Sequence, residues 1–146
     1  MSVSFINKLF KSKSNDDFCT AVVLAAGNSQ RMGKDKILMP LGGAPVIAHT
    51  LKALQSAECI DEIVVVTKYE RLQELADICH DHGISKASKV VVGGKTRLES
   101  SLIGVSNADE RAKYIAIHDG ARPFVTNSLI ERVVHSAHQH GASAPA

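Results

Sequence analysis

The sequence is poor in aromatic residues, has no tryptophan and carries no closely spaced pair of cysteines. Aromatic residues make up 4% of the chain, too few for a platform on which nucleic-acid bases stack. The Cys-x-x-Cys pairs of zinc and redox sites are absent. No apolar run approaches the roughly 20 residues that a membrane-spanning helix needs. We therefore expect neither a nucleic-acid partner nor a membrane span.

The charge is nearly balanced, and the length suits one domain. The 146 residues carry a formal net charge of +2, which fits small anionic ligands better than polynucleotides. Cys19, Cys59 and Cys79 are odd in number and each lies among apolar residues, which is typical of reduced thiols in a cytoplasmic protein. We interpret residues 1–18 as an N-terminal extension and residues 19–146 as the domain.

Short apolar segments rich in β-branched residues alternate with longer segments of helical period. This alternation is typical of βαβ units around a parallel sheet. The strand-like segments are almost continuously apolar, which indicates burial on both faces. They span residues 21–25, 62–67, 89–92 and 114–118. The prediction is an α/β fold: a three-layer, Rossmann-like, open and mostly parallel sheet with helices on both faces.

The segments between these strands carry apolar stripes and helix-capping signals. Three stripes with the spacing of one helix face are expected to face the sheet: Ile47, Leu51 and Leu54; Leu72, Leu75, Ala76 and Cys79; and Leu98, Leu102 and Val105. Helix starts are indicated at Pro45, Thr67 and Thr96, and helix ends at Gly83 and Gly141. The last helix is predicted over residues 127–140.

The segment after the first strand, AAGNSQRMGKDK, combines small residues with cations. In an open α/β sheet, ligands bind at the carboxyl ends of the strands. Residues 25–27 let the backbone approach a ligand, and Arg31, Lys34 and Lys36 follow closely. The spacing fits neither a Walker A loop nor a GxGxxG fingerprint. The pattern favours a nucleoside triphosphate over an ordinary turn with solvated lysines.

Two further loops are expected at the same sheet edge. VGGKTRLESS joins Gly93 and Gly94 to a helix start at Thr96, where the helix dipole favours anions or polar base edges. IHDGARPF places Asp119 directly after a strand, where a carboxylate beside a phosphate site is a natural Mg²⁺ ligand. Taken alone, Asp119 fits a turn-capping role equally well. Three such loops at one edge favour a nucleotide site.

The ordered motifs AAGxxxRMG, a following lysine, GGxxRxxS and HDxARP resemble those of the 2-C-methyl-D-erythritol 4-phosphate cytidylyltransferase family, over residues 19–146. The resemblance implies a fold of the nucleotide-diphospho-sugar transferase type. It implies transfer of a cytidylyl group from CTP to a sugar-alcohol phosphate, 2-C-methyl-D-erythritol 4-phosphate, with release of pyrophosphate, in isoprenoid biosynthesis. It also implies Mg²⁺ as cofactor, a cytoplasmic location and a homodimer for the full-length form.

The resemblance also carries expected roles onto particular residues. Arg31 and Lys36 would be the catalytic cations that steady the α-phosphate of CTP during attack. Asp119 would be the metal and substrate carboxylate, and Arg122 would contact the second substrate. The remaining nucleotide contacts would be Ala25, Ala26 and Gly27 in the first loop, Gly94 and Ser100 in the cytosine-reading segment, and Gly120 at the ribose.

The first and third motifs each depart from the family pattern at one point. Asp35 precedes Lys36 where the family usually has a proline after a longer spacer, so Lys34 can share the role of Lys36. Gly120 stands where the family often has alanine.

Two alternative readings remain open. One is another cytidylyltransferase, of the ribitol-phosphate or molybdenum-cofactor type, whose first loop is similar. The other is a non-catalytic nucleotide-binding fragment, because the residues after Gly141 look like the start of a further strand. We therefore expect a domain truncated at its C-terminus, which binds Mg·CTP but turns over poorly.

Overall fold

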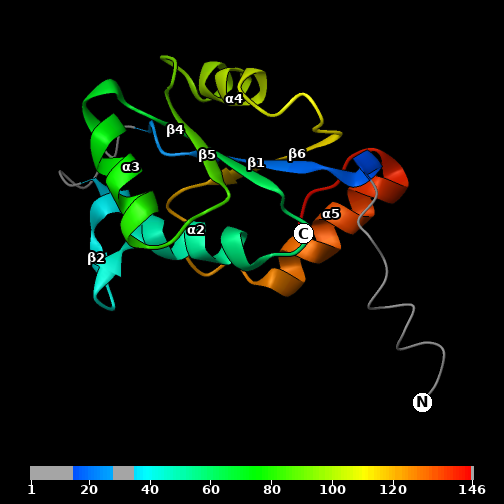
Figure 1. Cartoon of the computed structure of the whole chain (residues 1–146), viewed down its shortest axis with the longest axis horizontal. Helices are drawn as coiled ribbons and strands as arrows, with labels where there is room; N and C mark the ends of the chain where they lie inside the picture. The colour runs from blue at the N-terminus through cyan, green and yellow to red at the C-terminus, as the bar shows by residue number, and fades with distance from the viewer. Residues whose placement is uncertain (1–14, 28–34, 146) are drawn as a thin grey trace.

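A computed structural model describes residues 15–27 and 35–145. Its main sheet has four strands in the order β5-β4-β1-β6, and all neighbouring pairs are parallel (Figure 1). The strands are β1 (Cys19–Leu24), β4 (Glu62–Thr67), β5 (Ala87–Val92) and β6 (Tyr114–Asp119). Each predicted strand overlaps one of them, so the predicted parallel sheet is confirmed.

Helices cover both faces of this sheet (Figure 1). On one face, α4 (Arg97–Ser106) packs against β1, β4 and β5. The opposite face is covered by α2 (Val46–Ser56), α3 (Leu72–Asp81) and α5 (Asn127–His140). The three-layer α/β prediction is confirmed, and α5 has the predicted bounds of the last helix. The shorter elements are the 3-10 helices η1 (Asn15–Asp17), η2 (Lys36–Leu38) and η3 (Tyr69–Arg71) and the hairpin strands β2 (Pro40–Leu41) and β3 (Ala44–Pro45).

The core lies between the sheet and the three-helix layer. Strands β1 and β4 are central and almost fully buried, as their continuous apolar runs predict. For β5 and β6 the prediction of burial on both faces is wrong, because these are the edge strands and are partly exposed. Two predicted helix stripes enter this core, since α2 buries its stripe completely and α3 buries Leu75 and Cys79. The apolar face of α5 contributes Ile130 and Val134. These stripes therefore face the sheet as predicted.

Helix α4 packs on the sheet through small residues, and the prediction for its apolar stripe is wrong. The stripe is exposed, with exposed fractions of 69% for Leu98, 59% for Leu102 and 39% for Val105. The buried side is formed by Ser100, Ser101 and Gly104. A Cβ atom on Gly104 would lie 2.2 Å from Cγ1 of Val22, so the helix approaches β1 too closely for larger side chains. Apolar spacing alone did not reveal this close approach.

The helix boundaries confirm most of the capping signals. Thr96 and Glu99 form the predicted capping box of α4. Gly83 and Gly141 follow α3 and α5 with φ angles of 66° and 83°, the left-handed conformation that favours glycine at helix ends. The capping prediction for Thr67 is wrong, because Thr67 is the last residue of β4 and η3 begins two residues later. Pro45 lies one position before α2 rather than inside its first turn.

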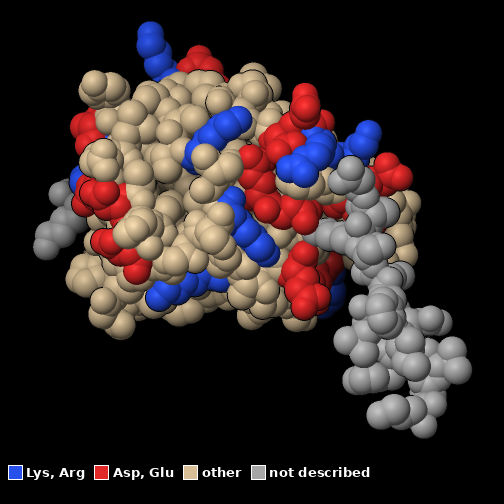
Figure 2. All heavy atoms as spheres, in the orientation of Figure 1, with Lys and Arg blue, Asp and Glu red and all other residues tan. Residues whose placement is uncertain are grey.

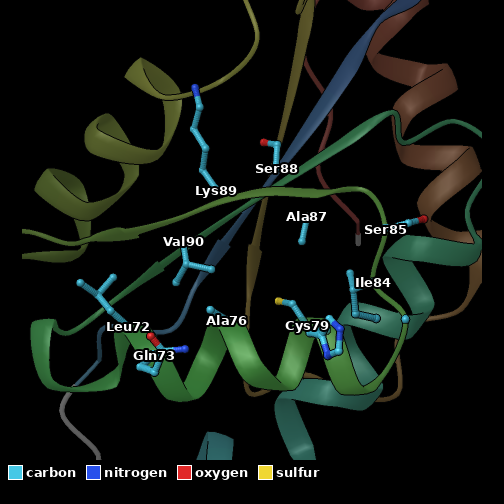
Figure 3. A pocket seen from close by; sticks show the side chains of 12 residues that line it. Leu72, Gln73, Ala76, Cys79, Ile84, Ser85, Ala87, Ser88, Lys89 and Val90 are labelled. Atoms are coloured by element: carbon cyan, nitrogen blue, oxygen red, sulfur yellow. The ribbon is translucent and has the colours of Figure 1, made fainter.

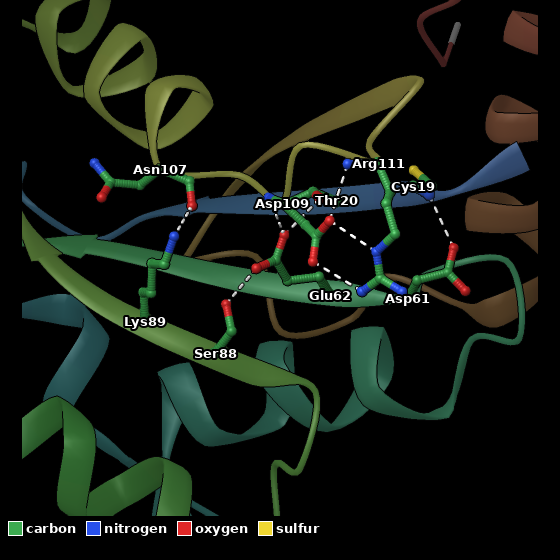
Figure 4. A network of polar contacts seen from close by, with 9 residues as sticks. All are labelled: Cys19, Thr20, Asp61, Glu62, Ser88, Lys89, Asn107, Asp109 and Arg111. Carbon is green, nitrogen blue, oxygen red and sulfur yellow. Dashed lines mark hydrogen bonds and ion pairs between the residues drawn. The ribbon is translucent and has the colours of Figure 1, made fainter. Parts of the chain in front are cut away.

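A buried carboxylate joins the amino ends of the strands, at the sheet edge opposite the three loops (Figure 4). Glu62 accepts hydrogen bonds from Oγ1 of Thr20 at 2.7 Å, from the backbone N–H of Asp109 at 2.8 Å and from Oγ of Ser88. Hydrogen bonds from Arg111 in turn hold the pKa of Asp109 well below its usual range. This network ties β1, β4 and β5 to the segment between α4 and β6.

The described surface carries both signs of charge. Figure 2 shows acidic and basic side chains lying close together on one face, most of which is uncharged. The three cysteines form no disulfide. Within residues 15–27 and 35–145, no helix combines the length and the apolar character that crossing a bilayer requires.

Candidate functional site

The described first residues of the three chemistry-bearing loops lie side by side at the carboxyl edge of the sheet, where backbone hydrogen bonds join them to neighbouring strands. The N–H of Ala25 donates to the carbonyl of Val66 at 2.7 Å, that of Gly93 to Thr67 at 2.8 Å, and that of Gly120 to Leu24 at 2.9 Å. Since each bond continues the pairing of parallel strands, the relative positions of the three loops are set by the sheet itself. The predicted juxtaposition is therefore present.

The first loop begins with three small residues that become more exposed along the chain. Ala25 is buried, Ala26 is half-buried, and Gly27 is exposed with open space around it. Lys36 is exposed at the start of η2. Arg31 and Lys34 lie outside the described residues, so their predicted roles stay predictions.

Asp35 has a partner that explains its presence in a cationic loop. Its carboxylate lies 3.6 Å from a terminal guanidinium nitrogen of Arg71, which belongs to η3 after β4. The Asp35 side chain is only 17% exposed, so this ion pair is partly shielded from water. Through this ion pair, Asp35 holds the end of the first loop, directly before Lys36, against the segment that connects β4 to α3.

The second loop is rigid, and its helix terminus is already occupied by a carboxylate. Glu99 accepts hydrogen bonds from the N–H of Lys95 at 2.6 Å and of Thr96 at 3.3 Å, while the N–H of Gly94 donates to Oγ of Ser100 at 3.2 Å. A Cβ atom on Gly94 would lie 2.3 Å from Cβ of Glu99, so only glycine fits there. Because Glu99 repels anions, this loop suits a neutral polar group such as a base edge rather than a phosphate.

The third loop holds one carboxylate between two guanidinium groups. Oδ1 of Asp119 accepts a hydrogen bond from Nη2 of Arg97 at 2.9 Å, and Oδ2 lies 3.2 Å from Nε of Arg122. Both arginines are largely exposed, and the Asp119 side chain is about one-third exposed. The prediction placed Asp119 and Arg122 in the site but omitted Arg97. The available signal for Arg97 was its place as the arginine of the GGxxRxxS motif, at the same sheet edge as Asp119.

Gly120 is built into the protein core beside this carboxylate. Its N–H donates to Leu24, and its carbonyl accepts a 2.8 Å hydrogen bond from Oγ1 of Thr50 in α2. A Cβ atom there would lie 2.6 Å from Cδ1 of Ile47. Both backbone polar groups of Gly120 therefore already have partners within the protein. The ribose contact predicted for Gly120 stays a prediction.

A groove of about 970 Å³ runs along β6 and α5, and Arg97, His118, Asp119 and Arg122 line it where β6 ends. Burial lowers the pKa of His118, and its Nδ1 is buried with no hydrogen-bond partner. His118 is therefore uncharged at neutral pH and does not add to the positive charge of the site. The charge at this end of the groove comes from the two arginines and Asp119.

The described residues do not form a metal centre by themselves. Within the part of the chain that the structure covers, no group of three or more histidine, cysteine, aspartate or glutamate side chains could hold a metal ion. Both carboxylate oxygens of Asp119 are engaged by guanidinium groups. The predicted metal role of Asp119 stays a prediction, and the geometry favours an arginine-organising role for its carboxylate.

A second depression lies between α3 and β5 (Figure 3). Its volume is about 650 Å³, and none of its lining residues belongs to the three loops. Cys79 points into it from α3, and burial raises the pKa of this thiol, so the thiol is a poor nucleophile. We therefore assign no side chain of this depression a role in the candidate site.

The sequence profile of the 2-C-methyl-D-erythritol 4-phosphate cytidylyltransferase family matches residues 19–146. Proteins with that name from Clostridium botulinum and Prosthecochloris aestuarii are each 36% identical over 127 and 138 residues, covering 86% of this chain and 56% and 57% of the relatives. The chain thus spans a little over half the length of these relatives.

A solved structure shows the same fold. The crystal structure of 4-diphosphocytidyl-2C-methyl-D-erythritol synthase from Anaerococcus prevotii superposes with a TM-score of 0.73 at 26% sequence identity. The match covers 86% of this chain and 52% of that one. The sheet and helices described above are therefore those of this group of nucleotidyltransferases.

Proposed function

Since this chain belongs to the 2-C-methyl-D-erythritol 4-phosphate cytidylyltransferase family, we propose that it serves the transfer of a cytidylyl group from CTP to 2-C-methyl-D-erythritol 4-phosphate. Pyrophosphate is the second product, and the reaction belongs to isoprenoid biosynthesis. The observation that carries the proposal is the meeting of the three motif-bearing loops at one sheet edge, fixed by backbone hydrogen bonds between neighbouring strands. The odd number and wide spacing of the cysteines in the sequence favour a cytoplasmic location, and family membership supports a homodimer.

The two nucleotide-binding loops divide the nucleotide between them. The second loop receives the cytosine, because Gly93 and Gly94 let a base approach the main chain and Glu99 disfavours phosphate there. The first loop receives the triphosphate along the backbone of residues 25–27, with Lys36 and Arg31 as the cations. The ribose then passes near Gly120, where the third loop begins.

The acceptor occupies the groove beside β6. Its phosphate monoester requires cations, and Arg122 supplies one at the end of β6. Asp119 orients Arg122 and faces the polar groups of the sugar alcohol. The acceptor phosphate is already ionised at neutral pH, so the attack needs no general base, in accord with a neutral His118.

The main barrier is the approach of two anions. The acceptor phosphate attacks the α-phosphorus of CTP in line, and negative charge builds on the equatorial oxygens. Cations at the first loop offset this charge at the moment it develops, which lowers the barrier. Magnesium, when bound, neutralises part of the triphosphate charge. Because Mg²⁺ usually keeps substrate phosphate oxygens among its ligands, we propose that it arrives as Mg·CTP.

The proposal is tested by two measurements on the same preparation. Isothermal titration calorimetry should show that Mg·CTP binds at least about tenfold more tightly than Mg·UTP, Mg·ATP or Mg·GTP, since base recognition rests on hydrogen bonds. Pyrophosphate release is then followed with 2-C-methyl-D-erythritol 4-phosphate and with ribitol 5-phosphate as acceptors. Failure to bind Mg·CTP overturns the proposal, and turnover with ribitol 5-phosphate alone would replace the acceptor.

A further inference from the structure

We propose that Arg97 is a positioning residue for the acceptor side of the site: it holds Asp119, and through Asp119 it sets the direction in which Arg122 faces the acceptor's phosphate monoester. This inference rests on the proposed function and adds a residue whose role the motifs did not supply. It also links the loop that receives the base to the loop that receives the acceptor.

The geometry places Asp119 as the shared partner of two arginines. Nη2 of Arg97 donates to one carboxylate oxygen at 2.9 Å, and Nε of Arg122 lies 3.2 Å from the other. Each guanidinium has further N–H groups beyond the one used here. The Arg122 side chain is 75% exposed and lines the groove, so its remaining N–H groups are accessible to a ligand.

Charge explains why a second arginine is needed. A lone Asp119–Arg122 pair would be neutral, and its carboxylate would repel an approaching phosphate. With Arg97 on the other carboxylate oxygen, the cluster has two cations and one anion, and it therefore attracts an anionic ligand. The carboxylate then acts as a spacer that keeps the two like charges at fixed positions.

Arg97 can hold Asp119 in place because its own backbone is fixed. It is the first residue of α4 and lies inside the capping box, directly after its N-cap residue Thr96. The carbonyl of Arg97 accepts a 2.9 Å hydrogen bond from Oγ of Ser101, which is buried against the sheet. The third loop has an equally firm base, because Asp119 pairs with Leu24 in the sheet register. The ion pair thus spans two rigid elements.

A purely stabilising role for the pair is a poor explanation. The Arg97 side chain is 67% exposed, and exposed ion pairs add little to stability because water and salt screen them. Removing Arg97 should therefore leave the fold intact. It should change the orientation of the Arg122 side chain and the net charge of the cluster that the acceptor contacts.

The test compares Arg97→Gln with the matched control Arg132→Gln, which removes an exposed arginine from α5. Arg97→Gln should weaken binding of 2-C-methyl-D-erythritol 4-phosphate by about tenfold, because a misdirected Arg122 loses its contact. The dissociation constant of Mg·CTP should change by less than about twofold in either variant. In an Asp119→Asn background, Arg97→Gln should have no further effect, since Arg97 acts through Asp119.

Acceptor binding within about twofold of the unaltered protein in Arg97→Gln would overturn the inference. A loss as large in the Asp119→Asn background would also overturn it, because Arg97 would then contact the acceptor itself.

Positioning is also measurable without any ligand, by NMR of the Arg122 Nε–H group. Arg97→Gln should speed its hydrogen exchange by roughly fivefold or more, because the ion pair between Arg122 and Asp119 is loosened. Unchanged exchange would refute the positioning role. If the unaltered protein binds no Mg·CTP, the proposed function fails, yet this exchange measurement still decides whether Arg97 positions Arg122.

Discussion

Thr20 and Glu62 face each other on neighbouring strands, and the Thr20 hydroxyl donates a 2.7 Å hydrogen bond to the Glu62 carboxylate. Glu62 is only 6% exposed, and burial alone would raise its pKa. Hydrogen bonds from Ser88, Asp109 and Thr20 outweigh burial and lower the pKa below the ordinary value of 4.5. The folded state therefore favours the ionised form of this carboxylate.

We predict that Glu62→Gln lowers the free energy of unfolding by about 1–3 kcal/mol at pH 7, since an amide N–H₂ group would face buried donors. A lowered pKa means that the unfolded chain takes up the proton more readily than the folded protein. The stabilisation by Glu62 is thus complete above pH 4.5 and is lost as the pH falls below that value. Urea unfolding should therefore show a smaller difference in unfolding free energy between Glu62→Gln and the unaltered protein at pH 3.5 than at pH 7.

The exposed Glu131→Gln on α5 is the control for the Glu62 prediction, and its effect should stay within about 0.5 kcal/mol. An equal stability difference between Glu62→Gln and the unaltered protein at both pH values would contradict the assigned role of the carboxylate.

The close contact between Gly104 and Val22 gives a second prediction, on the packing of α4. Alanine at position 104 would gain about 1 kcal/mol of helix propensity. Its Cβ would however lie 2.2 Å from Val22 and 3.0 Å from Val66, both fully buried, so α4 would have to move. We expect Gly104→Ala to lower the free energy of unfolding by about 1–3 kcal/mol, because overpacking outweighs propensity.

Leu102→Gln serves as the comparison within the same helix. Leu102 is 59% exposed, so this substitution should change the unfolding free energy by no more than about 0.5 kcal/mol. Urea unfolding of both variants measures the effects. A stabilised Gly104→Ala or a strongly destabilised Leu102→Gln would mean that α4 packs by its leucines after all.

The contrast between α2 and α4 shows what could be predicted from the sequence. In α2 the apolar stripe marks the buried face, because the helix lies at a distance that leucine and isoleucine side chains fill. In α4 the same spacing misleads, because the distance between helix and sheet is set by Gly104 and Ser101 against β1 and β4. Periodicity gives the direction of apolar residues but not the separation of the layers.

Long-range polar contacts were harder to predict than the loops that contain them. The three loops follow apolar strands, and strand order is not needed to place them at one edge. The pairing of Arg97 with Asp119 joins residues 22 positions apart and depends on where α4 begins relative to β6. The hairpin β2–β3 was missed because two-residue strands are too short to show any period.

The third prediction concerns Lys36, at the end of the first loop. A cation about 4 Å from the developing charge contributes on the order of 4 kcal/mol at an effective dielectric constant of 20, before desolvation is subtracted. The Asp35–Arg71 ion pair holds the backbone just before Lys36, so only the lysine side chain has to be ordered when substrate binds. In the full-length form, we expect Lys36→Ala to lower kcat by roughly 10²-fold or more, and we expect the same of Arg31→Ala.

Pyrophosphate release measures this loss, and circular dichroism checks that the fold is intact. Lys52→Ala, which removes an exposed lysine from α2, is the matched control and should retain full activity. Asp35→Asn should give a smaller loss than Lys36→Ala, because it loosens the anchor while leaving the cation in place. Activity of Lys36→Ala within about threefold of the unaltered protein would remove Lys36 from the catalytic role and leave Lys34 as the candidate cation.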